Sequence, residues 1–294
     1  MPITKRHVVV FAVRIAGWTI ALAILGIALA GLPYYTKPLA GRVRDPLHSW
    51  LRPSGTVGQS LGILALCLFL FLWLYPLRKK LARVPSLGSL PRWLDVHVVA
   101  GLLVPLVAAV HAGFRCDGLI GLGYLAMAIV CASGIIGRYL YAHIPRSRSG
   151  IALTLDEVGL ERRQLLHDLA RTIGRPVPEV ERRLVPPAAL APTLNPLRLL
   201  VRMGRGDLAR RHALRHFRAE LAASGVHLDG ERSRQVLASA RREMALAQQA
   251  VLLEAVQRLF RWWHAAHRPF AVTALVAVLL HVAVAVMLGQ TWFR

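Results

Sequence analysis

Two apolar stretches decide the fold of this 294-residue chain: HVVAGLLVPLVAAVH at 97–111 and HRPFAVTALVAVLLH at 267–281. Each stretch begins and ends with a histidine, and the members of each pair lie fourteen positions apart: His97 with His111, and His267 with His281. Because an α-helix turns by about 100° per residue, fourteen residues return both histidines of a pair to nearly the same face. A rise of about 1.5 Å per residue sets them about 21 Å apart along the helix, which is most of a bilayer core of roughly 30 Å. Ionisable side chains are costly inside hydrocarbon, so this repeated pattern indicates a functional role.

The composition predicts a membrane protein. Hydrophobic residues make up 55% of the chain and the mean hydropathy is +0.47. Five stretches are long enough to span a bilayer, at about 9–32, 57–77, 94–114, 118–142 and 268–289. We interpret the first as a retained helix, because its apolar run is long and no small-residue cleavage site follows it. The predicted fold is an all-α integral membrane protein, with five transmembrane helices and a helical soluble insertion between the fourth and fifth.

Three segments follow from this pattern: transmembrane helices one to four at 1–142, an arginine-rich helical insertion at 143–267, and the fifth helix, which completes the bundle, at 268–294. Within the insertion, Thr154 and Glu157 form a capping-box pattern at the start of a helix. The prolines between 176 and 196 predict turns or extended chain, with helical spacing only at 179–185. A helix is then expected with Asp207 near its start. Apolar residues at helical spacing from 230 to 266 predict one long helix that continues into the fifth span.

Basic residues predict the orientation in an inner (cytoplasmic) membrane. The segment before the first span carries Lys5 and Arg6, and the loop after the second span carries Arg78, Lys79, Lys80, Arg83 and Arg92. The opposing loop at 33–56 also carries four basic residues, so the bias is modest. We expect the N-terminus and the insertion in the cytoplasm and the C-terminal QTWFR outside. The third and fifth spans then run parallel, which pairs His97 with His267 at the inner surface and His111 with His281 at the outer surface.

Two histidine pairs stacked across a bilayer are what two bis-histidine haem b groups require. Zinc is a rival metal for these histidines, but a zinc ion needs three or four ligands close together. The same histidines could instead form a proton relay, or simply hydrogen-bond to neighbouring helices. His267 is preferred over His264, because only His267 repeats the spacing of the third span. Arg138 is the first candidate to face the anionic propionates, and His143 is expected at the level of the lipid headgroups.

The remaining features narrow the function. The net charge of +22 favours acidic protein partners and anionic lipid over nucleic acid, because no nucleic-acid motif accompanies it. The three cysteines form no CxxC pair, so neither a c-type haem attachment nor an iron–sulfur run is present. No P-loop occurs, and GLIGLG at 118–123 lies inside a span, so no nucleotide site is expected.

The four histidines and GIIGRYLYAHIPR, which ends the intervening span, resemble the di-haem cytochrome b class and its ferric-reductase-like membrane domain. The resemblance covers about 94–143 and 264–290. It implies an electron-transfer subunit rather than a complete enzyme, carrying electrons across the membrane between a redox partner and a quinone or second redox protein. The partner subunit would be an iron–sulfur, flavin or multihaem c-type protein. Two other functions fit the same pattern: a stand-alone quinone- or metal-reducing oxidoreductase, and a membrane scaffold or assembly factor for a respiratory complex.

Overall fold

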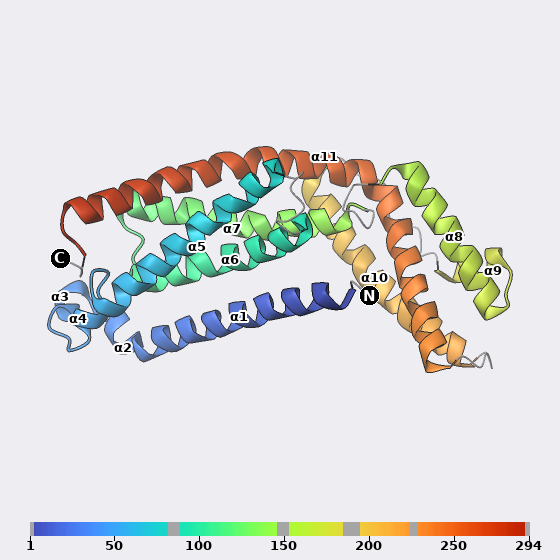
Figure 1. The fold of residues 1–294 in the computed structure, drawn as a ribbon, viewed down its shortest axis with the longest axis horizontal. Helices are drawn as coiled ribbons and strands as arrows, with labels where there is room; N and C mark the ends of the chain where they lie inside the picture. Colours follow the sequence, from blue (N-terminus) through green and yellow to red (C-terminus); the bar gives the residue numbers. More distant parts are fainter. Residues whose placement is uncertain (1–2, 82–88, 146–152, 185–194, 224–228, 292–294) are drawn as a thin grey trace. The chain divides into compact units, whose positions relative to one another are not determined.

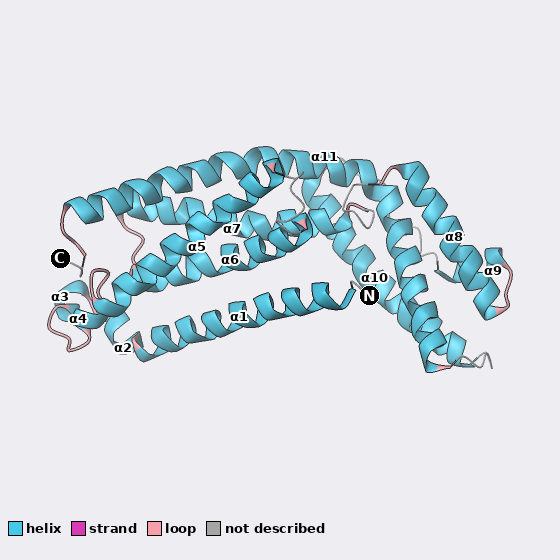
Figure 2. Cartoon of the chain, viewed as in Figure 1, coloured by secondary structure: helices cyan, strands magenta, loops and turns pink. Residues whose placement is uncertain are grey.

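The computed structural model describes residues 3–81, 89–145, 153–184, 195–223 and 229–291, and all regular structure in these ranges is α-helical (Figures 1 and 2). The chain divides into two compact units. The first unit comprises residues 1–138 and 263–294, and the second comprises residues 139–262. Arg83 and the proline-rich stretch at 185–194 lie outside the described residues.

Five helices are long and apolar enough to cross a membrane, which indicates a multi-pass membrane protein. An apolar helix suits this role because it satisfies its own backbone hydrogen bonds where no water can. The helices are α1 (Ile3–Ala30), α5 (Thr56–Lys80), α6 (Leu90–His111), α7 (Gly118–His143) and α11 (Gly230–Met287). Each overlaps one of the spans expected from the sequence, although α1, α6 and α11 end two or three residues before the expected span does. The predicted continuity from 230 into the fifth span is confirmed, because α11 is one helix of 58 residues.

Small residues let the helices of the first unit approach closely. A Cβ added at Gly17 of α1 would lie 2.6 Å from the Val99 side chain of α6, and one added at Gly123 of α7 would lie 2.8 Å from Ala277 of α11. Such contacts are typical of helix packing in lipid, where close van der Waals contact replaces the hydrophobic effect. Side chains from four helices share one buried cluster, which includes Phe69, Val104, Met127 and Ala274.

The segment between α1 and α5, expected only as a charged loop, contains three short helices. These are α2 (Leu32–Tyr35), α3 (Leu39–Arg42) and α4 (His48–Leu51). Tyr34 and Tyr35 are buried, and the Tyr34 hydroxyl lies 3.0 Å from Nδ1 of His48. Arg42 donates to the carbonyl oxygen of Gly113 at 3.1 Å, so this segment is fastened to the end of α6. Arg42 therefore has a structural role as well as adding to the positive charge of this segment.

The second unit is built from α8 (Leu155–Ile173), α9 (Val177–Leu184), α10 (Pro196–Ala223), the last turn of α7 and the first part of α11. Its core includes Leu169, Leu184, Phe217 and Met244. The predicted capping box is confirmed: the Thr154 hydroxyl accepts from the backbone N–H of Glu157, and the Glu157 carboxylate accepts from the backbone N–H of Thr154.

One helix start was predicted wrongly. We expected a helix with Asp207 near its beginning, whereas α10 begins eleven residues earlier, at Pro196. The Asn195 side chain caps this start by accepting from the backbone N–H groups of Leu197 and Arg198, at 3.0 and 3.1 Å. The two glycines before Asp207 lie inside this helix, and Gly206 packs against Gln248.

Candidate functional site

His97 and His111 of α6 each hold a backbone carbonyl through one ring nitrogen. Nδ1 of His97 donates to the Leu72 oxygen at 3.1 Å, and Nδ1 of His111 donates to the Gly58 oxygen at 2.8 Å. A carbonyl oxygen only accepts, so Nδ1 carries the proton in both rings. In a neutral imidazole the other nitrogen, Nε2, then presents its lone pair, which is the arrangement typical of metal-ligating histidines.

The Leu72 carbonyl is available to His97 because of a proline. In a regular helix the oxygen of residue 72 accepts from the N–H of residue 76, but Pro76 lies inside α5 and has no N–H. The carbonyl is therefore left without its helical donor, and His97 supplies one from α6.

His111 approaches α5 at a glycine. A Cβ added at Gly62 would lie 2.7 Å from Cε1 and 2.9 Å from Nδ1 of the His111 ring. Only glycine, which has no side chain, leaves room for the His111 imidazole to come this close to the α5 backbone. The same approach brings Nδ1 to the Gly58 oxygen, one turn earlier on α5. Gly62 therefore determines where the His111 ring lies.

His267 of α11 is held by a serine of α7. The Ser133 hydroxyl lies 2.7 Å from Nδ1 of His267 and 2.8 Å from the Val130 carbonyl oxygen. Its single proton goes to the carbonyl, which cannot donate, so the hydroxyl accepts the Nδ1 proton of His267. Nε2 of this ring is again left with its lone pair, as in the two histidines of α6.

An indole packs against the same ring. Trp263 lies 4.8 Å from His267 between ring centroids, and its Nε1 donates to the Ser133 carbonyl oxygen at 2.7 Å. Gly137 makes the space, because a Cβ there would lie 2.0 Å from the indole. Ser133 thus contacts both rings, through its hydroxyl and its backbone oxygen.

The structure brings together the rings of one expected histidine pair. His111 and His281 lie 6.2 Å apart between ring centroids, with their planes at 68°. Two metal–nitrogen bonds of about 2 Å, with about 1.2 Å from each nitrogen to its ring centre, would set two ligand rings about 6 Å apart. The spacing of His111 and His281 would therefore fit two histidines that share one metal ion. No group of three or more His, Cys, Asp or Glu side chains suited to one metal ion occurs among the described residues.

Three further side chains lie near His97 or His267. His264 is exposed, with its ring 5.9 Å from Trp263. Arg138, expected to face propionates, forms a 2.7 Å ion pair with Asp95, two residues before His97. The ring of Tyr75 lies 5.0 Å from that of His97. Asp95 therefore holds the guanidinium of Arg138 near the N-terminal end of α6.

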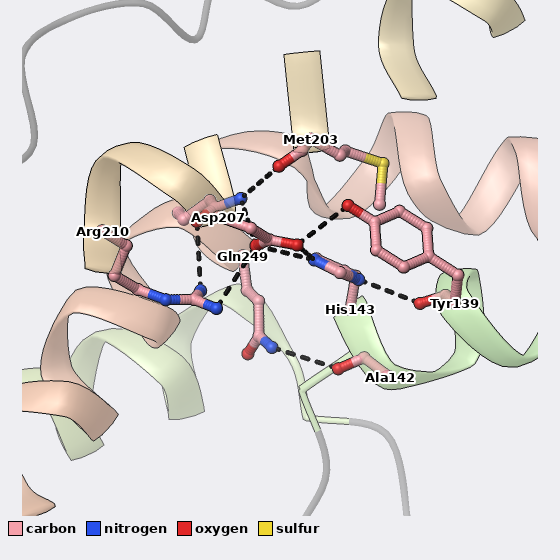
Figure 3. Close-up of polar contacts among 8 residues, drawn as sticks. Tyr139, Ala142, His143, Met203, Asp207, Arg210 and Gln249 are labelled. Carbon is pink, nitrogen blue, oxygen red and sulfur yellow. Dashed lines mark hydrogen bonds and ion pairs between the residues drawn. The ribbon is translucent and has the colours of Figure 1, made fainter. Parts of the chain in front are cut away.

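A second polar site, which the sequence did not predict, lies in the second unit (Figure 3). His143, expected at headgroup level, is buried, and its Nε2 lies 3.1 Å from both carboxylate oxygens of Asp207. Its Nδ1 lies 2.9 Å from the Tyr139 carbonyl oxygen. Both ring nitrogens of His143 therefore lie within hydrogen-bonding distance of oxygen acceptors.

Three further donors converge on Asp207. The Tyr139 hydroxyl lies 2.9 Å from Oδ2, and Arg210 and Gln248 lie 3.2 Å from Oδ1. Burial alone would raise the pKa of Asp207, but the hydrogen bond and charge of His143, with Tyr139 and Arg210, lower it below its usual value. Asp207 and His143 are 64 positions apart, so no spacing pattern in the sequence predicts that they pair.

Comparisons of this chain with protein-family models, with curated proteins and with solved structures found no match. The geometry of the histidine pairs is therefore the evidence on function.

Proposed function

We propose that this chain is a di-haem cytochrome b subunit that carries electrons across a membrane between a redox partner protein and a quinone or second redox protein. One observation carries the proposal: three of the four histidines bind an acceptor through Nδ1, so that Nε2 of each is left to ligate a metal. The 6.2 Å separation of the outer pair supports it.

His97 and His267 would hold one haem b, and His111 and His281 the other. When bound, each haem supplies a site that takes up and releases one electron. The hydrogen bonds at Nδ1 fix the tautomer and orientation of each ring and raise its basicity. Arg138, held by Asp95 near His97, would provide a cation for the propionate carboxylates of the haem bound by His97 and His267.

The orientation and partners belong to the same proposal. The basic residues in the last turn of α5, Arg78, Lys79 and Lys80, favour an inner membrane with the N-terminus and the second unit in the cytoplasm. With no nucleotide motif in the sequence, electrons would come from a partner with iron–sulfur, flavin or multihaem c-type centres. The electron acceptor or donor on the other side would be a quinone or another redox protein.

The test is the haem content of the purified chain. A pyridine haemochrome assay is expected to give two non-covalent b-type haems per polypeptide, reducible with b-type absorption bands. A chain without such bands would contradict the proposal and favour a scaffold or assembly factor. A ratio of one would contradict the two-site arrangement.

Single substitutions assign the ligands. His97→Ala and His267→Ala are expected to remove one spectral component, and His111→Ala and His281→Ala the other. His264→Ala is the matched control, because it lies on the same helix but is exposed. If the control loses a haem and His267→Ala keeps both, the ligand assignment is wrong.

A further inference from the structure

The second unit exposes an apolar stripe on α10. Leu197, Val201 and Leu208 retain 70%, 48% and 54% of their accessible surface. At about 100° per residue, spacings of four and seven place these side chains within about 40° of one another. Gly204 falls on the same line and has open space around it. The opposite face of α10 is already buried, through Met203 and other side chains. These four residues, which we call the α10 stripe, therefore form an exposed apolar surface that takes no part in the core of the second unit.

Arginines border the α10 stripe on both sides. At about 100° per residue, Arg198 and Arg205 fall on one side of the stripe. In the turns that follow Leu208, Arg211 and Arg218 fall on the other side of its line and Arg215 falls on the line itself. All five are exposed. The helix has two acids, and both pair elsewhere: Asp207 with Arg210 and His143, and Glu220 with His216 and Arg183. The borders of the stripe therefore keep a positive charge.

This pattern matches a helix that lies in a membrane surface. Such helices bury an apolar face at the boundary between headgroups and acyl chains, while arginine stems extend along it and the guanidinium groups reach lipid phosphates. The second unit is also tethered, because it begins on α7 and ends on α11, both candidate spanning helices. A tether raises the effective concentration of the bilayer at the unit, so a short stripe suffices.

We propose that the outward face of α10 docks on the membrane surface, with the α10 stripe in the headgroup layer and its bordering arginines on the phosphates of anionic lipids. Charge decides the lipid class, since each basic residue near an anionic leaflet adds to the attraction. A protein partner is the competing occupant, and the experiment distinguishes the two. The docking does not depend on haem.

The test uses the full chain with its three cysteines replaced by alanine. A single cysteine is introduced by Val201→Cys or Leu208→Cys and labelled with an environment-sensitive fluorophore. The matched control is Arg171→Cys on α8, whose side chain is 83% exposed. Each protein is reconstituted in vesicles of phosphatidylcholine, with or without phosphatidylglycerol, and quenching by brominated lipids and by aqueous iodide is measured.

Brominated lipids are expected to quench labels at 201 and 208 but not at 171, more strongly with phosphatidylglycerol. The combined change Arg198→Glu and Arg205→Glu is expected to reduce that quenching. Lipid quenching at 201 no greater than at 171 would overturn the docking. Equal quenching with and without phosphatidylglycerol would overturn the anionic preference. Protection from iodide without lipid quenching would show a protein contact and would also overturn the proposal.

Discussion

Replacing Asp207 by alanine is expected to destabilise the second unit by about 3 kcal/mol. The carboxylate accepts from Tyr139, His143 and Gln248 and pairs with Arg210, so the change leaves four donors without their acceptor. Removing one partner of a buried charge pair costs about 3–5 kcal/mol. We take the lower end, because the Asp207 and Arg210 side chains keep 19% and 22% of their surface and water can partly replace the acceptor.

Hydrogen–deuterium exchange of the full chain measures this loss locally. At about 1.4 kcal/mol per tenfold change, 3 kcal/mol corresponds to roughly a hundredfold faster exchange of the protected amides of α10. Asp168→Ala is the matched control: its side chain is 69% exposed and its ion pair with Arg171 is 4.0 Å long, so exchange is expected to change little. Asp207→Asn keeps one acceptor oxygen and is expected to lie between the two. If exchange in Asp207→Ala stays within about threefold of the control, the cluster does not stabilise the unit and the reasoning is wrong.

The other predictions concern pH and the histidine pairs. Because the pKa of Asp207 is lower in the folded than in the unfolded chain, its ionised carboxylate stabilises the fold above the unfolded pKa of about 3.9, and this stabilisation is lost as the pH falls through the folded pKa. The difference in thermal midpoint between wild type and Asp207→Asn is therefore expected to be full near neutral pH and to vanish in acid. A difference that does not change with pH would contradict this. Ser133→Ala removes the hydroxyl that accepts from Nδ1 of the proposed ligand His267, and it is expected to weaken retention of the haem held by His97 and His267 by about 10- to 100-fold, measured as transfer to apomyoglobin. Ser60→Ala, at an exposed position, is the control and is expected to have no effect. Equal transfer rates in the two variants would contradict the role of the hydroxyl. Gly62→Val is expected to displace the adjacent imidazole and remove the outer haem signal only, with Gly26→Val, where open space surrounds the position, as the control; retention of both signals would refute the steric argument.

The sequence alone determined the features that depend on neighbouring residues. Apolar length predicted five spanning helices, because a backbone in lipid must satisfy its hydrogen bonds within the helix. The capping residues Thr154 and Glu157 fixed the start of α8, and apolar spacing predicted the continuity of α11. The parallel direction of the third and fifth spans predicted that His111 would lie near His281, and these two rings are 6.2 Å apart.

Tertiary structure decided what surrounds each ring. Pro76 signals in the sequence that a carbonyl one turn earlier lacks its donor, yet only the packing of α5 on α6 shows that His97 takes it. The acceptor of His267 comes from 134 positions away on α7. His143 was expected at the headgroups, and its pairing with Asp207 was not predicted, because Asp207 lies on a helix whose start was misplaced. Side-chain partners across helices depend on which faces meet, and that is set by the packing of the whole unit rather than by the period of any one segment.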